Sequence, residues 1–448
     1  MPDSMIDSIG TMGWKEGAGS ATTLTVRERS IDRMGAPADV PAPHGANYLR
    51  PPPDKDPEVL TYGKWAAVVL HDDQAGAADA LAPLIAHRRE NGHLWNDGII
   101  ALNPSAEGSL ASWRRRFKRG IGNDKPPYYL LLVGGPDRFP FEMQYDLDLH
   151  KAVGRLDASE IPGGDFSWDA CRCYAEKVVA YERNEIAIEP KPLFYSLQSD
   201  NATRISHKHL VAPLSVTVPG GVDPLYGDDA MVSNLCQALD TDRAPKIVFT
   251  ASHGFEFPKD PVLWGALTAA KHSGSARDPL VTANVAAGAE RFGYGSIVFS
   301  FACFSAGVPV RSAVSFLAGD GDKIIEMGAR VAALPRQLLG HPKGPVAFIG
   351  HVDRVTAVAF QSSFGMARIA PYDDFLSWLR NQGATVGQAL GTIRENARVV
   401  GTQITAALET ASEHKGDKHI LKKAGRKWIG FRDYRGFMLL GDPAVTPP

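Results

Sequence analysis

Two apolar runs of this chain each stop at a side chain that can take part in acid–base or nucleophilic chemistry. The stretch KIVFTASHGFEFP, residues 246–258, contains His253, and the stretch GSIVFSFACFSAG, residues 295–307, contains Cys303. A thiol becomes a strong nucleophile when it loses its proton. A neighbouring imidazole can take that proton or, as imidazolium, lower the pKa of the thiol. The two runs therefore predict a thiol nucleophile with a histidine as its base.

Taken singly, each of these residues has an ordinary structural explanation. A cysteine at the end of a buried strand is usually a small apolar residue, and a histidine there is often only hydrogen-bonded. Together they lie 50 positions apart (303 − 253), a spacing at which a histidine precedes a catalytic cysteine. Gly254 allows close backbone approach. Its N–H and that of Cys303 would form an oxyanion hole, at roughly 3 kcal/mol per donor. The combination favours catalysis.

Both side chains follow runs that are typical of buried strands. Similar runs are KWAAVVLHDD, DGIIALN, PYYLLLVGGPDRFP, KPLFYSLQSD and GPVAFIG, and helical patterns separate most of them. Continuous apolar strands that alternate with helices predict an α/β fold whose mostly parallel sheet is covered on both faces. Functional residues of such sheets gather at the carboxyl ends of the strands. This placement would bring His253 and Cys303 close together.

Three other segments carry predictions that the structure can test. Residues 1–60 are rich in Pro and Gly and end in APADVPAPHGANYLRPPPDKDP, which predicts a tail or an arm that wraps the surface. The pattern DKIIEMGARVAALPRQLLG, residues 322–340, predicts a helix. Residues 412–427 are basic and polar, and we expect a loop there.

Composition argues against several classes of function. The chain has 448 residues and a formal net charge of −2, so nothing in its charge predicts a nucleic-acid or membrane partner. We find no run long enough to span a bilayer and no secretory signal. The four cysteines are too few for a disulfide scaffold, which fits a reducing cytoplasm. Cys171 and Cys173 lack the second pair that a zinc site needs, so we predict no metal.

The motifs TASHG and FSFACFSAGVP resemble the catalytic motifs of clan CD cysteine peptidases, the group of caspases, legumains, separases and gingipains. Several flanking segments are similar to the gingipain family in the same order. These segments are YYLLLVGGPDRFP, KAVGRLDAS followed by AEKVVAYER, GPVAFIGHVD and GFMLLGDPAV. The resemblance covers roughly residues 60–447, in pieces.

The resemblance implies a caspase-like α/β/α sandwich in two side-by-side subdomains. Residues 61–190 would form a non-catalytic subdomain, and residues 191–448 the catalytic one. The implied activity is that of an endopeptidase with a Cys303–His253 dyad, an acyl-enzyme mechanism and no cofactor. The expected partners are a protein or peptide substrate and, in addition, a regulatory protein.

Further site residues follow from the same resemblance. In the family, the loop after the strand KPLFYSLQSD supplies a carboxylate that orients the histidine, and the start of the next helix supplies the base of the primary specificity pocket. Asp200 and Arg204 fall at these two places. An arginine in the pocket would favour substrates with Asp or Glu before the scissile bond. If Asp200 lay there instead, Arg or Lys would be preferred, and an apolar pocket is a third alternative.

His351 and Asp353, in GHVDRV, follow the strand at 346–350 and are candidates for lining the substrate groove. Two other readings of the whole chain stay open. One is a catalytically degenerate caspase-like module that serves for protein interaction. The other is a different thiol enzyme, such as an amidase or acyltransferase that acts on a small molecule. A closed pocket would favour the small-molecule enzyme, whereas a peptidase needs a groove for an extended chain.

Overall fold

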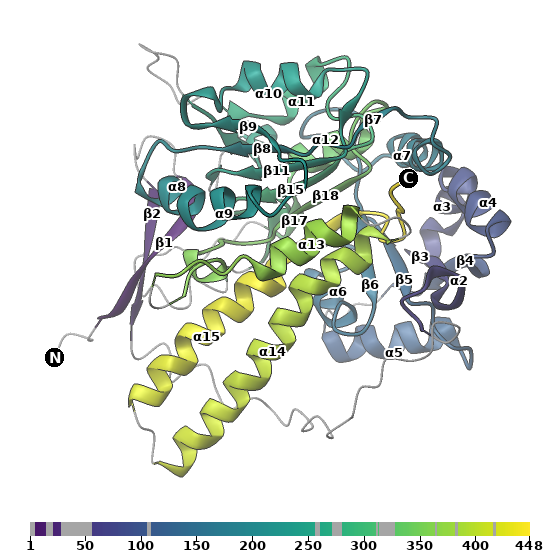
Figure 1. Cartoon of the computed structure of the whole chain (residues 1–448). Coiled ribbons are helices and arrows are strands. Elements are labelled where there is room, and N and C mark those ends of the chain that lie inside the picture. Colours follow the sequence, from purple (N-terminus) through teal and green to yellow (C-terminus); the bar gives the residue numbers. More distant parts are fainter. Residues whose placement is uncertain are drawn as a thin grey trace.

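A sheet of ten strands forms the centre of the computed structural model (Figure 1). Its strands lie in the order β4 (Leu94–Leu102), β3 (Trp65–Leu70), β5 (Tyr129–Val133), β6 (Ala152–Leu156), β19 (Phe437–Gly441), β18 (Ala347–His351), β15 (Ile297–Phe301), β11 (Ile247–Ala251), β8 (Leu193–Ser196) and β9 (Asp223–Tyr226). The structure describes residues 5–14, 21–27, 56–104, 109–255, 260–270, 280–310, 312, 328–362, 365–380, 384–414 and 418–448.

The sheet contains two parallel runs. Strands β4, β3, β5 and β6 pair in parallel and form the first run. Strands β18, β15, β11, β8 and β9 form the second run, also in parallel. Strand β19 lies between the runs, antiparallel to β18. The sheet is thus mostly parallel, as the sequence predicts.

Helices cover the sheet on both sides, which makes the fold an α/β sandwich (Figure 1). Alternate residues of β3 show this directly. Trp65, Ala67 and Val69 belong to one buried cluster, whereas Ala66 and Val68 join another that contains side chains of helix α5. Such alternation follows from the two-residue period of a strand.

The helices form groups that can be followed along the chain. The first group, in which α7 contacts each of the others, is α3 (Gln74–Ala80), α4 (Ala82–Glu90), α7 (Trp168–Glu182) and α12 (Ala333–Gly340). The second group is α13 (Ala370–Arg380), α14 (Val386–Glu413) and α15 (Lys418–Gly436). The remaining helices are α2 (Leu60–Gly63), α5 (Leu110–Ile121), α6 (Phe141–Leu147), α8 (Asn201–Ser206), α9 (Ala212–Ser215), α10 (Val232–Leu239) and α11 (Ala283–Gly288), with short turns η3 (His207–Val211) and η6 (Ala357–Ala359).

Aromatic side chains fix the register of the second run. Phe194, Phe249 and Phe299 are paired across β8, β11 and β15. The rings of Phe194 and Phe249 stack with centroids 5.2 Å apart, and those of Phe249 and Phe299 with centroids 5.1 Å apart. Each such pair contributes about 0.5–1.5 kcal/mol beyond the area it buries. Because a one-residue slip would turn all three rings to the other face, the stack locks the strands in register.

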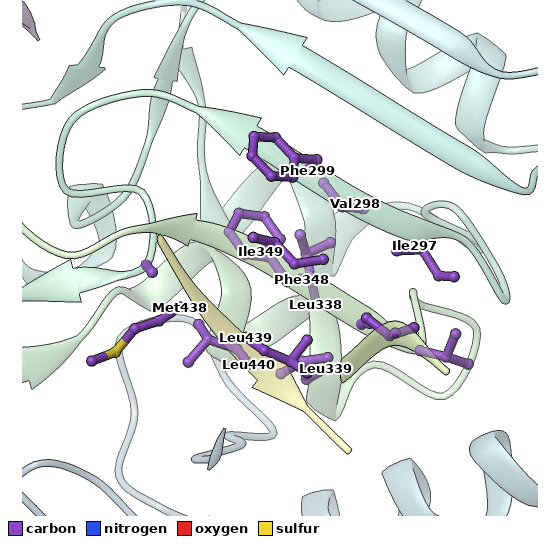
Figure 2. Packing of buried hydrophobic residues seen from close by; sticks show 14 of the residues in the cluster. Ile297, Val298, Phe299, Leu338, Leu339, Phe348, Ile349, Met438, Leu439 and Leu440 are labelled. Atoms are coloured by element: carbon purple, nitrogen blue, oxygen red, sulfur yellow. The ribbon is translucent and has the colours of Figure 1, made fainter. Parts of the chain in front are cut away.

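Figure 2 shows how the middle of the core is filled. Side chains of β15 and β18 lie beside those of α12 and β19, with Val298, Leu338, Phe348 and Leu439 among them. Met438 and Leu440 come from the closing strand, which the sequence separates from β15 by more than a hundred positions. The last strand of the chain is therefore a part of the central core.

A smaller sheet adjoins the end of β11. Its order is β14 (Leu280–Val281), β13 (Leu267–Thr268), β12 (Gly254–Phe255), β1 (Met5–Trp14) and β2 (Ala21–Arg27). Within the predicted N-terminal arm, residues 1–60, the structure thus describes two paired strands. Two further two-stranded pairs are β7 (Ile188–Glu189) with β10 (Ala244–Pro245), and β16 (Gly307–Val308) with β17 (Arg330–Val331).

Two predictions from the sequence are wrong. The segment 412–427 is not a loop, because α14 continues to Glu413 and α15 begins at Lys418. Lys, Arg, Ala and Leu favour a helix even where the composition is polar, and α15 packs along α14 with Ala424 and Ile429 buried. The helix predicted from residue 322 begins only at Ala333, after β17, and residues 321–327 lie outside the described residues.

The division near residue 190 into two subdomains stays a prediction. In the described residues, no helix combines the length and the apolar character that crossing a membrane requires.

Candidate active site

The register of the second run places His253 opposite Cys303. Phe249 is paired with Phe299, and each residue lies four positions after its phenylalanine (253 − 249 and 303 − 299). The pairing of β11 and β15 ends at Ala251 and Phe301, and Ser252 N still donates to Phe301 O over 3.4 Å. The two candidate catalytic residues therefore follow the paired strands directly, at matching positions.

Gly254 lies against the backbone of Cys303. A Cβ atom at Gly254 would be 1.6 Å from the carbonyl oxygen of Cys303 and 2.9 Å from its nitrogen. Only glycine allows this approach, since the obstacle is main chain and cannot turn aside. The contact brings the His253–Gly254 peptide and the Cys303 backbone together.

Asp200 joins the site from the end of β8, and its two carboxylate oxygens have different partners. Oδ2 lies 2.7 Å from His253 Nε2. Oδ1 accepts from the backbone N of Thr203 and from the Thr203 hydroxyl, each over 2.9 Å. These bonds make Asp200 the N-cap of α8, with Thr203 completing a capping box. The helix end therefore fixes the carboxylate in the orientation in which it meets the imidazole.

The environment keeps Asp200 ionised. Burial by itself would raise the pKa of the carboxyl, but the hydrogen bond and charge of His253, with the hydrogen bonds from Thr203, hold that pKa well below its usual range. A carboxylate hydrogen-bonded to Nε2 also selects one tautomer of the neutral ring, the one with its proton on Nε2. The remaining ring nitrogen, Nδ1, is then the basic one.

Thr268 of β13 holds the backbone of His253 in place. His253 N donates to Thr268 Oγ1 over 3.1 Å, and Thr268 N donates to His253 O over 3.0 Å. The histidine is thus fixed both through its main chain and through its ring. A positioned base of this kind is what general acid–base catalysis requires.

The sulfur of Cys303 lies against the backbone of Val355. Val355 N donates to Sγ over 3.2 Å, and the thiol donates to Val355 O over 3.5 Å. Val355 lies in the loop after β18, so four strand ends of the second run, those of β8, β11, β15 and β18, take part in the site.

The turn after the cysteine has unusual backbone angles. Phe304 has φ 56° and Asp353 has φ 97°, a region that side chains other than glycine rarely adopt. Phe304 N donates to Asp353 O over 2.8 Å, which ties the two turns together. Residues in such conformations cluster at functional sites, and these two flank the loops that hold Cys303.

The other predicted site residues lie in different surroundings. Arg204 is exposed on α8, four positions after Asp200. His351 is buried, with its two ring nitrogens 2.9 Å and 3.1 Å from the carbonyl oxygens of Asp353 and Asp433. Burial lowers the pKa of His351 to about 4, so the ring is neutral.

The carboxylate of Asp353 is also buried, where it accepts from the Ser312 hydroxyl and from Arg354 N. In the closed site, His351 and Asp353 support the turn. That either side chain lines the substrate groove stays a prediction.

The candidate site is closed. His253 and Cys303 have no exposed surface, and the side chain of Asp200 is 19% exposed. In the described part of the chain, no group of three or more His, Cys, Asp or Glu side chains could hold a metal ion.

Sequence reasoning missed Thr203, Thr268 and Val355. Asp-x-x-Thr before a helical pattern is a recognisable capping signal and would have pointed to Thr203. Thr268 and Val355 act through tertiary contacts, and no local pattern marks them.

No protein-family model matches the chain, and no curated protein matches it. Among solved structures, one described as "Structure of Protease" is similar to it with a TM-score of 0.48 and 13% sequence identity. The similarity covers 86% of this chain and 78% of the other. A likeness at this level does not bear on the chemistry of the site.

Proposed function

We propose that the chain is a cysteine endopeptidase in which Cys303 and His253 form the catalytic dyad. The observation that carries the proposal is the Asp200–His253 hydrogen bond of 2.7 Å beside a glycine that contacts the Cys303 backbone. A nucleophile, a base and a group that orients the base are the parts that covalent catalysis needs. The resemblance of TASHG and FSFACFSAGVP to clan CD peptidases also supports it.

The mechanism assigns one task to each group. His253, through Nδ1, takes the proton of the Cys303 thiol, and the thiolate attacks the scissile carbonyl carbon. The resulting oxyanion accepts from the N–H groups of Gly254 and Cys303. His253 then gives its proton to the leaving amine as the C–N bond breaks. In the second half, it takes a proton from water, whose hydroxide releases the acyl group and restores the thiol. Asp200 orients the ring throughout.

A thiol-labelling experiment separates this proposal from a degenerate interaction module. In the active enzyme, an electrophilic peptide probe should label Cys303 far faster than Cys171, Cys173 or Cys236, because in the proposed mechanism His253 takes the proton of the Cys303 thiol. Labelling of all four cysteines at one rate would contradict the peptidase.

A peptide library tests the substrate class. No cleavage of any peptide, together with selective labelling of Cys303, would favour a small-molecule thiol enzyme.

For specificity we propose that Arg204 binds an acidic side chain before the scissile bond. Both oxygens of Asp200 already have partners, His253 and Thr203. Asp200 is therefore poorly suited to form the floor of the specificity pocket. The Arg204→Ala variant should lose about 100-fold in kcat/KM on substrates with Asp or Glu there.

Lys208→Ala is the matched control for this test, because Lys208 is an exposed cation one turn further along the same helical segment. It should leave the preference unchanged. Efficient cleavage after Arg by the wild-type enzyme would exclude the Arg204 pocket.

A further inference from the structure

The N-terminal strand β1 lies beside the residues that follow the candidate catalytic histidine. Gly13 pairs with Gly254 and Trp14 with Phe255, in parallel. Strand β2 pairs with the outer edge of β1 in an antiparallel direction, and we call these two strands, residues 5–14 and 21–27, the N-terminal hairpin, seen beside α8 in Figure 1. The edge of β12 that β1 takes is thus not open to any other strand.

Strand β1 also contacts α8 and η6. Three of its neighbours, β12, α8 and η6, begin next to a group of the site. Strand β12 starts directly after His253, α8 starts directly after Asp200, and η6 starts two positions after Val355, whose backbone contacts the Cys303 sulfur. The hairpin therefore lies between the elements that surround the dyad.

This position agrees with the burial of the site. His253 and Cys303 are both fully buried, although a peptidase must bring an extended peptide into contact with its nucleophile. Extended peptides bind by adding a strand to a free edge, where main-chain hydrogen bonds supply affinity. Here the chain supplies that strand itself.

We propose that the N-terminal hairpin, β1 and β2, is an inhibitory segment that occupies the place of the substrate and keeps the enzyme latent. This inference rests on the proposed peptidase function. In the part of the chain that the structure describes, strand β1 pairs with β12 at Gly13–Gly254 and Trp14–Phe255. Residues 28–55 connect it to the rest of the chain. A cut in this connection, or a partner that binds the hairpin, would open the site to an extended peptide.

The test uses the full chain, folded before anything is removed. A recognition sequence for a specific protease is inserted within residues 28–55, and the same preparation is compared before cutting and after the released fragment has been separated. We expect Cys303 to react with a small neutral thiol reagent at least about tenfold faster after release, with a similar gain in peptide cleavage. Cys171, buried on α7 away from the hairpin, is the internal control and should not change.

Amide hydrogen exchange at Gly254 supplies a readout that does not depend on catalysis, and Phe255, whose N donates to Ala266 O over 3.1 Å, is its control. Exchange at Gly254 should rise on release and fall again when a synthetic peptide of residues 1–27 is added, which should also suppress cleavage. The inhibitory role would be overturned if Cys303 of the uncut chain reacted as fast as that of the cut chain and the uncut chain cleaved peptides at the same rate. If release exposes Cys303 but no peptide is cleaved, the hairpin covers the site as described and the peptidase function is the part that fails.

Discussion

The loops that follow the strands differ between the two parallel runs of the sheet. At the ends of β5 and β6 of the first run, charged side chains have partners inside the protein. Arg155 donates to Gln144 and to the carbonyl oxygens of Gly134 and Phe139, and Asp157 pairs with Arg336 over 3.0 Å. After β8 and β11 of the second run, Asp200 pairs with His253 beside the Cys303 backbone.

Both runs place polar residues at strand ends, where loops converge, so topology alone does not distinguish them. The difference lies in what the polar atoms do. A buried arginine that donates to backbone carbonyls stabilises a loop, since leaving those carbonyls unpaired would cost free energy. A carboxylate that shares its oxygens between a helix cap and an imidazole fixes a base. We therefore expect changes in the first run to alter stability and changes in the second run to alter activity.

The largest difference should come from the cysteines. Cys303→Ala is expected to reduce peptide cleavage by the activated enzyme by at least about 10⁴-fold, because the nucleophile is lost. Cys171→Ala, at a buried cysteine on α7, should keep the activity. Peptide hydrolysis and thermal unfolding are measured for both variants. His253→Ala added to Cys303→Ala should cause no further loss, since the two residues act as one unit.

More than a trace of cleavage by Cys303→Ala would contradict the dyad. Loss of activity in Cys171→Ala without loss of folding would contradict the expectation that residues outside the second run affect stability and not activity.

A smaller effect is expected from two glycines. Gly254→Ala would place a methyl group on the Cys303 carbonyl oxygen and displace the proposed oxyanion donors, so kcat/KM should fall by about 10²–10³-fold. Gly135→Ala, after β5, would bring its Cβ to 2.5 Å from Asp137 Oδ1. That atom is the end of a side chain and can move, so activity should be retained. Equal kinetics for the two variants would remove Gly254 from the mechanism.

The third comparison concerns two aspartates. Asp200→Asn keeps the cap on α8 and removes the negative charge from His253, and it should lower kcat by about 10- to 100-fold, part of what a well-positioned base contributes. Asp157→Asn should leave kcat unchanged and alter stability, because it removes the charge from a buried pair with Arg336. Kinetics and urea unfolding of both variants check these outcomes.

The pH dependence of the free energy of unfolding should have opposite signs at these two residues. The pKa of Asp200 is depressed, so its contribution is fully present above the unfolded value of about 3.9 and is lost as the pH falls below that value. Burial raises the pKa of Asp157 despite its arginine partner, so its contribution is lost as the pH rises from about 3.9 through the folded pKa. The difference in the free energy of unfolding between each variant and the wild type, measured between pH 3 and 7, would show both trends. A change of the same sign with pH for both residues would contradict this prediction.

Part of the fold and of the site can be predicted from the sequence because the evidence is local. Continuous apolar runs predict buried parallel strands, and a His and a Cys behind two of them predict a shared edge. Even the register has a local signal, since Phe249 and Phe299 precede His253 and Cys303 by the same four positions. The helix α15 was missed because a polar composition conceals good helix formers, and its burial depends on α14.

The tertiary structure decided the rest. The Asp200–His253 hydrogen bond, the Val355 backbone at the Cys303 sulfur and the β1 strand beside Gly254 are contacts between residues that lie 52 to more than 200 positions apart. Such contacts depend on how strands and loops are brought together, and no window of sequence contains both partners. The sequence by itself thus determined which residues can do the chemistry. The packing of the folded chain decided which of them meet, and that a strand from its own N-terminus lies beside them.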